Sequence, residues 1–307
     1  MENKTTEKEK IYAMAMTVIV AGAVLAIIFM YNFLQNPSKI FFGKNVAQNI
    51  SISDLEEAVL PSSGVVLPVS WGDLGAQLVK TGVIDEEKFK SLYEGRGQFT
   101  EEYKQLLTGT SSGKLKITQD NAGYILNLLW ALGLANKNPI LDTGEMMDPK
   151  YGGGNPPAGG FASTGGWTMA KGNAMDHYSH HKFFDLTPQQ QVIVDRVSSG
   201  IYRPCCGNST HFPDCNHGMA MLGLLELMAS QGVSEQDMYK AALAVNSYWF
   251  PDTYLTIATY MKDKGVLWQD VSPQEMLGVN YSSGSGYAKI SAQVKQQEGQ
   301  KGGGCGV

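Results

Sequence analysis

The sequence predicts a mostly α-helical protein, with a single N-terminal transmembrane helix and an extracytoplasmic helical body that carries a Cys/His-rich loop between two helices. Three observations lead to this fold class: an uncharged apolar run near the start, apolar residues that recur at helical spacing with no convincing strand pattern, and a tight cluster of cysteine and histidine. The 307 residues carry a net charge of −5. A chain-wide basic field for nucleic acid is therefore excluded, and no nucleic-acid partner is expected.

The apolar run from Ile11 to Tyr31 contains no charged side chain. As a helix it would span roughly 30 Å, the thickness of a bilayer core. A cleaved signal peptide has a shorter apolar core and a small-x-small cleavage site, whereas this run continues into an Asn-Phe-Leu stretch that ends at Leu34. We therefore predict an uncleaved signal anchor over residues 11–34.

The lysines around this segment predict its orientation. Three lysines precede it and two follow it within ten residues, which places residues 1–10 in the cytoplasm. The chain is then a single-pass protein of the cell membrane, bound to the bilayer through Ile11 to Leu34, with its C-terminal body outside the cytoplasm. A second membrane protein is a candidate partner.

The body divides by composition. We expect a linker over 35–65 with a short helix near Asp54, a helical domain over 66–150 and a Gly/Pro-rich loop over 151–174. A helical domain with the Cys/His site then covers 175–290, and a polar, flexible tail covers 291–307. In the first helical domain, the longest predicted helix carries a buried stripe of leucines and isoleucine and ends at Asn136.

Helix starts are well marked in the second half of the chain. Thr187-Pro188-Gln189-Gln190 is a capping box with proline at the first helical position, and it opens a helix that stops near Gly200. A second helix is expected from about Gly218 to Gly232. A third opens at Ser234 and a shorter fourth at Ser272.

The chemistry is concentrated in one stretch of the chain. All five histidines lie between positions 177 and 217, and three of the four cysteines lie between 205 and 215. Clustered thiol and imidazole groups are what a transition-metal site requires, with Zn and Cu ahead of Fe. The predicted ligands are Cys206, His211, Cys215 and His217 first, then Cys205, with His177, His180 and His181 as helpers from the preceding segment.

The same residues leave other functions open, and the sequence does not decide whether the protein is an enzyme. The leading interpretation is metal handling or sensing. Alternatively, Cys206 acts as the nucleophile of a thiol–disulfide exchange or haem-handling factor. In the third interpretation, a disulfide between Cys206 and Cys215 staples two helices of a structural subunit in a membrane assembly.

The stretch over residues 190–254 resembles the membrane-anchored three-helix thiol domain of the cytochrome c maturation (CcmH-type) family. The likeness rests on a helix, a cysteine loop, a second helix and the step Gly232-Val233-Ser234-Glu235-Gln236-Asp237 into an acidic third helix. The family's Cys-x-x-Cys is not kept, since Arg203 stands at the first cysteine position and only Cys206 carries over. The resemblance implies a membrane-anchored helix–Cys-loop–helix module.

Overall fold

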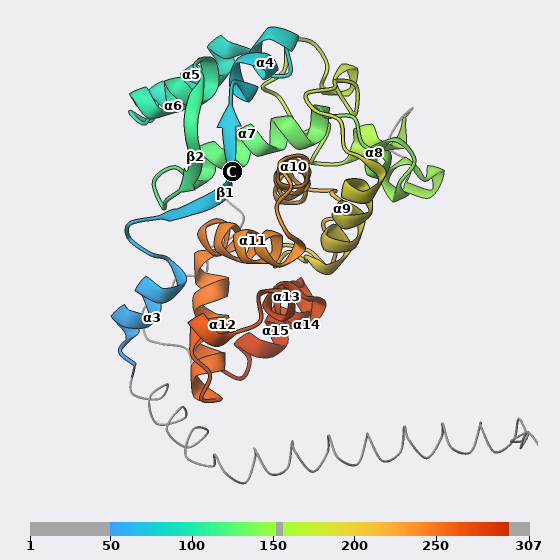
Figure 1. The fold of residues 1–307 in the computed structure, drawn as a ribbon. Helices are drawn as coiled ribbons and strands as arrows, with labels where there is room; N and C mark the ends of the chain where they lie inside the picture. The colour runs from blue at the N-terminus through green and yellow to red at the C-terminus, as the bar shows by residue number, and fades with distance from the viewer. Residues whose placement is uncertain (1–49, 152–155, 295–307) are drawn as a thin grey trace, which may run out of the picture.

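The computed structural model describes residues 50–151 and 156–294 (Figure 1). Helices predominate in this part of the chain, as predicted. The α-helices are α3 Ile52–Val59, α4 Leu74–Thr81, α5 Glu86–Glu94, α6 Glu101–Thr108, α7 Ala122–Ala135, α8 Pro139–Asp142, α9 Pro188–Gly200, α10 Asn216–Ser230, α11 Glu235–Trp249, α12 Pro251–Asp263, α13 Pro273–Leu277, α14 Val279–Ser282 and α15 Gly284–Ser291. Two strands, β1 Val65–Gly72 and β2 Ser111–Ile117, form one antiparallel pair.

The two strands correct the prediction that the body lacks β-structure. In β1 the side chains of Leu67, Val69 and Trp71 are buried alternately, and β2 buries Leu115 and Ile117 in the same way. This two-residue period is the signature of a strand with one buried face. The pairing is irregular around Pro68, which lacks the N–H that a regular ladder needs. Both strands fall within residues 65–117, where a purely helical domain was expected over 66–150, so that part of the prediction was wrong.

Helices α7 and α10 cross at close range. A Cβ atom on Gly133 of α7 would lie 2.1 Å from the carbonyl oxygen of Met219 in α10, and one on Gly223 would lie 2.5 Å from the carbonyl oxygen of Leu129. Only glycine allows the two backbones to approach this closely. Figure 1 shows α10 lying between α7 above and α11 below, at the centre of the molecule.

The segment between α8 and α9 contains only short 3₁₀ turns among its described residues. It is nevertheless packed against the body, because the indole N–H of Trp167 donates to the carbonyl of Val83 and that of Trp130 donates to the carbonyl of Ser163. The two indole rings lie 4.9 Å apart. The predicted Gly/Pro-rich loop is thus irregular in structure but held in place by tryptophan.

Most of the predicted helix starts in the second half are confirmed. Thr187 and Gln190 form the capping box that opens α9, Ser234 caps α11 and Ser272 caps α13. The prediction missed α12, which begins at Pro251 directly after α11, and the short helices α14 and α15. Figure 1 shows α12 to α15 grouped below α11.

The predicted fold class also needs correction in its membrane part. None of the helices within residues 50–151 and 156–294 is long and apolar enough to cross a bilayer. The segment over 11–34, to which the span was assigned, lies outside the described residues.

Candidate metal and thiol site

The cysteine loop joins the end of α9 to the start of α10 and is fastened at both ends. The amide of Thr210 donates to the carbonyl of Ile201, and the amide of Tyr202 donates to the carbonyl of Leu277 in α13. The amide of Gly284, at the first position of α15, donates to the carbonyl of Cys206. Contacts to three separate parts of the chain therefore hold the cysteines in position.

Arg203 organises the interior of this loop. Its side chain is 1% exposed, and its guanidinium donates to the carbonyl oxygens of Ser209 and Phe212 and to a carboxylate oxygen of Asp214. The second carboxylate oxygen of Asp214 accepts from the side-chain amide of Asn208. A Cβ on Gly218 would lie 2.7 Å from the guanidinium, so glycine at that position makes room for it. The loop is folded around one buried cation.

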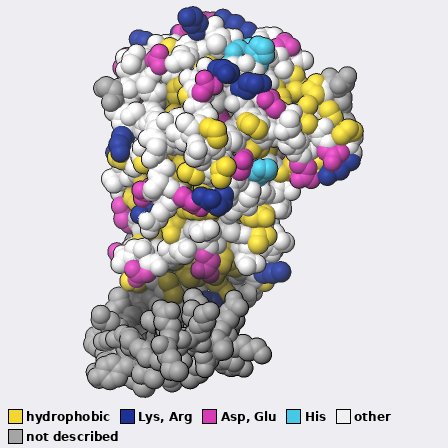
Figure 2. Space-filling view, turned by 45° about the vertical axis from the view of Figure 1, so that its right-hand side comes forward, with side chains coloured by type: hydrophobic (Ala, Val, Ile, Leu, Met, Phe, Trp, Pro, Cys, Tyr) yellow, Lys and Arg dark blue, Asp and Glu magenta, His cyan; other side chains and the backbone are white. Residues whose placement is uncertain are grey.

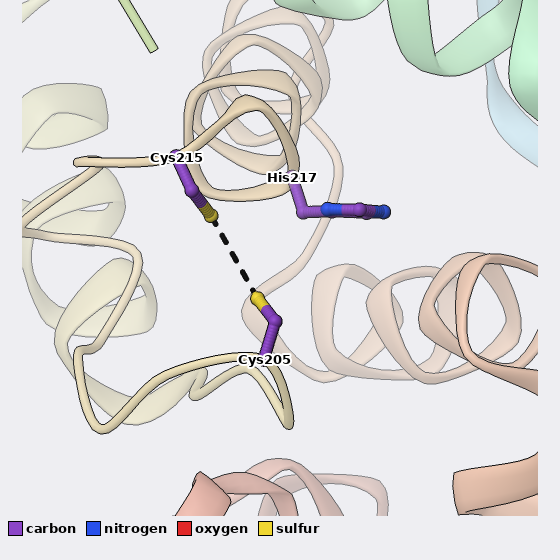
Figure 3. Close-up of side chains that lie close together, drawn as sticks. All are labelled: Cys205, Cys215 and His217. Carbon is purple, nitrogen blue, oxygen red and sulfur yellow. Dashed lines mark hydrogen bonds between the residues drawn. The ribbon is translucent and has the colours of Figure 1, made fainter. Parts of the chain in front are cut away.

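Three cysteines and one histidine converge beside this guanidinium. The sulfurs of Cys205 and Cys215 lie 3.9 Å apart and point toward each other, while the imidazole of His217 extends to one side (Figure 3). A donor atom from each of Cys205, Cys215 and His217 lies within 4.8 Å of the other two. The same holds for Cys206, Asp214 and Cys215. Cys215 belongs to both groups, so the two form one continuous cluster.

All three of these cysteines are free thiols, and the alternative disulfide between Cys206 and Cys215 is not present. Hydrogen bonds from the thiols of Cys205 and Cys215 lower the pKa of Cys206, and the charge of Arg203 and the amide of Asn208 lower it further. Hydrogen bonding to Cys206 raises the pKa of Cys205. The cluster therefore places its first negative charge on Cys206.

The pKa of Cys215 is raised as well. The hydrogen bond with Cys205 acts against this rise, but the hydrogen bond with Cys206 and burial outweigh it. Cys215 is the N-cap residue of α10, and the backbone amide of Gly218 in the first turn acts to lower the pKa of Cys215. The helix terminus thus favours a thiolate at Cys215 once a cation is present to share its charge.

His217 lies in the first turn of α10, with its ring 4.4 Å from the ring of Phe250 and 5.8 Å from that of Trp249. Burial, helped by the charge of Arg203, lowers its pKa to about 4. The imidazole is therefore neutral at physiological pH, which is the form that binds metals.

The other predicted ligands lie apart from this cluster. His211 is part-exposed, with Nε2 3.9 Å from a carboxylate oxygen of Asp195, and it belongs to neither donor group. His177 and His181 form a pair in which Nδ1 and Nε2 are 2.9 Å apart, and the ring of His180 stands edge-on to that of His181. On the face shown in Figure 2, histidine side chains appear at two separate places.

The sequence interpretation did not assign a role to Arg203 or Asp214 at the site. The available signal was the single arginine directly before Pro204-Cys205-Cys206, followed by an acid directly before Cys215. Such charges beside thiols indicate control of thiolate formation.

Comparisons of the chain with protein-family models, curated proteins and solved structures found no match. The resemblance to the CcmH-type family stays a prediction.

Proposed function

We propose that the protein binds a transition metal ion, Zn²⁺ in the first place, through Cys205, Cys206, Cys215 and His217, and that it serves in metal handling or sensing. One observation carries this proposal: two donor groups that share Cys215. Together they contain three thiols, one imidazole and the carboxylate of Asp214. Because Arg203 and Asn208 already hold that carboxylate, the remaining donors are those of a Cys₃His zinc site.

The distance between two of the sulfurs supports this donor set. At 3.9 Å, Cys205 and Cys215 are too far apart for a disulfide, whose bond is about 2.05 Å long. Two sulfurs bound to one tetrahedral Zn²⁺ at about 2.3 Å from the metal lie about 3.8 Å apart. The pair already has the spacing that zinc ligation requires.

The surroundings supply the charge balance. Three thiolates around a divalent ion carry a net charge of −1, and the guanidinium of Arg203 lies close enough to favour them electrostatically. The loop hydrogen bonds of Arg203 also hold the cysteine backbone in place, as residues beyond the direct ligands do in metal sites.

Exposure favours handling or sensing over a purely structural role. Cys205 is an exposed residue, and Cys206 and Cys215 are only partly buried. An ion held there would be within reach of a competing chelator or a partner's ligands. Four protein ligands would close the coordination sphere, as in structural zinc sites, but the exposure of Cys205 leaves the ion accessible to a competing ligand.

Metal content tests the proposal. Untagged protein should contain close to one equivalent of Zn, Cu or Fe by elemental analysis, and Co²⁺ loading should give the thiolate-to-cobalt absorption of a tetrahedral site. Cys215→Ser and His217→Ala should reduce both signals. His211→Ala is the matched control and should leave them unchanged, because His211 lies outside the donor groups. Equal metal content in Cys215→Ser and in the parent protein would refute the assignment.

Thiol–disulfide exchange is the second candidate, favoured by the lowered pKa of Cys206. Thiol oxidoreductases use a thiolate at neutral pH and a neighbouring thiol that resolves the mixed disulfide, and this cluster contains one such thiolate and two neighbouring thiols. The two functions separate in one alkylation experiment with iodoacetamide at pH 7. If metal binding is the function, Zn²⁺ should protect Cys206 from modification. Rapid modification regardless of Zn²⁺, together with reduction of a model disulfide, would support exchange instead.

A further inference from the structure

A cavity of about 400 Å³ lies next to the cysteine cluster, where α5, α7, α10 and α11 meet. Its lining includes Leu92, Tyr93, Tyr124 and Trp249, and His217 forms part of the wall toward the cysteines. Small-molecule sites are concave, of roughly 300–1,000 Å³, and lined by apolar and aromatic groups with a few polar ones. The volume fits this description, and the lining combines aromatic side chains with several polar ones such as Gln98, Gln119 and Asn127.

Hydrogen bonds hold the aromatic walls of the cavity rigid. The hydroxyl of Tyr124 donates to the carbonyl of Tyr103, and the side-chain amide of Asn127 donates to the hydroxyl oxygen of Tyr93. The indole N–H of Trp249 donates to the carbonyl of Ala122. Because the protein itself uses these polar atoms, the rings offer mainly carbon surface to a ligand. A wall fixed in this way loses little conformational entropy on binding.

Two opposite charges also line the cavity. Arg96 follows α5 and Asp120 precedes α7, and both are exposed. Within the described part of the chain, neither forms an ion pair with another residue or with the other. An aromatic cavity that carries one free guanidinium and one free carboxylate is complementary to a molecule with a planar ring and both charges.

We propose that this cavity is a binding site for a small zwitterion with an aromatic ring, of the aromatic amino acid class. The ring lies among the tyrosine and tryptophan side chains, the ligand carboxylate pairs with Arg96 and its ammonium group pairs with Asp120. This site is separate from metal binding, since neither charged contact involves a cysteine. His217 is the one residue that the cavity shares with the proposed metal centre, so an occupant would lie beside that centre.

Calorimetric titration of the full chain tests this assignment, with L-phenylalanine as the probe. Phenylacetate lacks the ammonium group, 2-phenylethylamine lacks the carboxylate and L-alanine lacks the ring. We expect saturable binding of L-phenylalanine and about tenfold weaker binding of each analogue. Arg96→Gln should weaken L-phenylalanine binding about five- to tenfold and leave 2-phenylethylamine binding unchanged. Asp120→Asn should weaken L-phenylalanine similarly and leave phenylacetate unchanged.

A space-filling pair of variants keeps the test independent of the charges. Gly123 lines the cavity, and a Cβ there would meet no atom within 4 Å. Gly123→Leu should fold and abolish binding, while Gly123→Ala should retain it. Absence of saturable L-phenylalanine binding would overturn the proposal, as would equal affinity in Arg96→Gln or in Gly123→Leu. The two proposals fail separately in the parent protein, since neither charged contact involves a metal ligand. Parent protein that binds L-phenylalanine but holds no metal would refute only the metal centre, and parent protein that holds metal but does not bind L-phenylalanine would refute only the cavity assignment.

Discussion

The buried carboxyl of Glu226 makes the stability of the protein depend on pH in a direction that can be calculated. Glu226 lies on α10 with no exposed surface; one oxygen accepts from the side-chain amide of Asn136 at 2.9 Å, and the other has no partner in the described structure. Burial raises its pKa well above the ordinary value of 4.5. The folded protein therefore holds a proton here that the unfolded chain releases.

The sign follows from this proton. Between pH 4.5 and the raised folded-state pKa, the native state binds one more proton than the unfolded state. The contribution of Glu226 to the free energy of unfolding is therefore complete below pH 4.5 and is lost as the pH rises through this window. The loss is about 1.4 kcal/mol for each pH unit in this window. Replacing Glu226 with glutamine keeps the shape and removes the titration. Glu226→Gln should therefore gain stability over the parent protein by that amount per unit.

Urea unfolding at steps of half a pH unit from pH 5 to pH 8 measures the difference in stability between Glu226→Gln and the parent protein. A glutamine side chain also adds an N–H group that needs a partner, and this shifts the stability of the variant by the same amount at every pH. The prediction therefore concerns the slope of the stability difference with pH. Glu56→Gln, an exposed change on α3, is the matched control for the substitution of a glutamate by glutamine. A gap between Glu226→Gln and the parent protein that stays constant over this range would refute a protonated Glu226.

Three further predictions follow from packing, the loop cation and the histidine pair. Gly133→Ala should destabilise the fold by about 1–3 kcal/mol in urea unfolding, because its Cβ would meet a backbone oxygen of α10 at 2.1 Å. The control Gly123→Ala should be neutral or stabilising, because a Cβ there meets no atom within 4 Å and alanine favours the helix. Arg203→Lys should weaken Zn²⁺ binding about tenfold or more in chelator competition, because lysine cannot contact both loop carbonyls and the Asp214 carboxylate; unchanged affinity would contradict this. Burial lowers the pKa of His181 below 6.5, so the parent protein should lose stability as pH falls below 6.5, and His181→Gln should lose less.

Local signals predicted the helices where capping chemistry is explicit. Thr187, Ser234 and Ser272 each accept a hydrogen bond from the backbone amide three residues on, and each opens a helix where expected. The strand β1 was missed because Pro68 interrupts it, and because Leu67, Val69 and Trp71 lead directly into a helical pattern at Leu74. The alternation was present in the sequence, but it competed with a stronger helical period.

The ligand set shows the same division. That Cys205, Cys206 and Cys215 come close together is a consequence of their short separation on one loop, and sequence spacing alone made it the expected outcome. The sequence did not show that His217 joins them and His211 does not. His217 lies in the first turn of α10, whereas the amide of His211 donates a hydrogen bond to the carbonyl of Ser198, which holds that stretch against α9.

The amino-acid order alone determined that this chain is rich in helix and that the thiols of Cys205, Cys206 and Cys215 lie on one loop, because caps, apolar periodicity and clustering act over a few residues. Folding in three dimensions decided which donors share a point in space, where Arg203 is buried and which walls enclose the cavity beside His217. Those features depend on contacts between residues tens of positions apart, such as the bond from Gly284 to Cys206, and no local pattern encodes them.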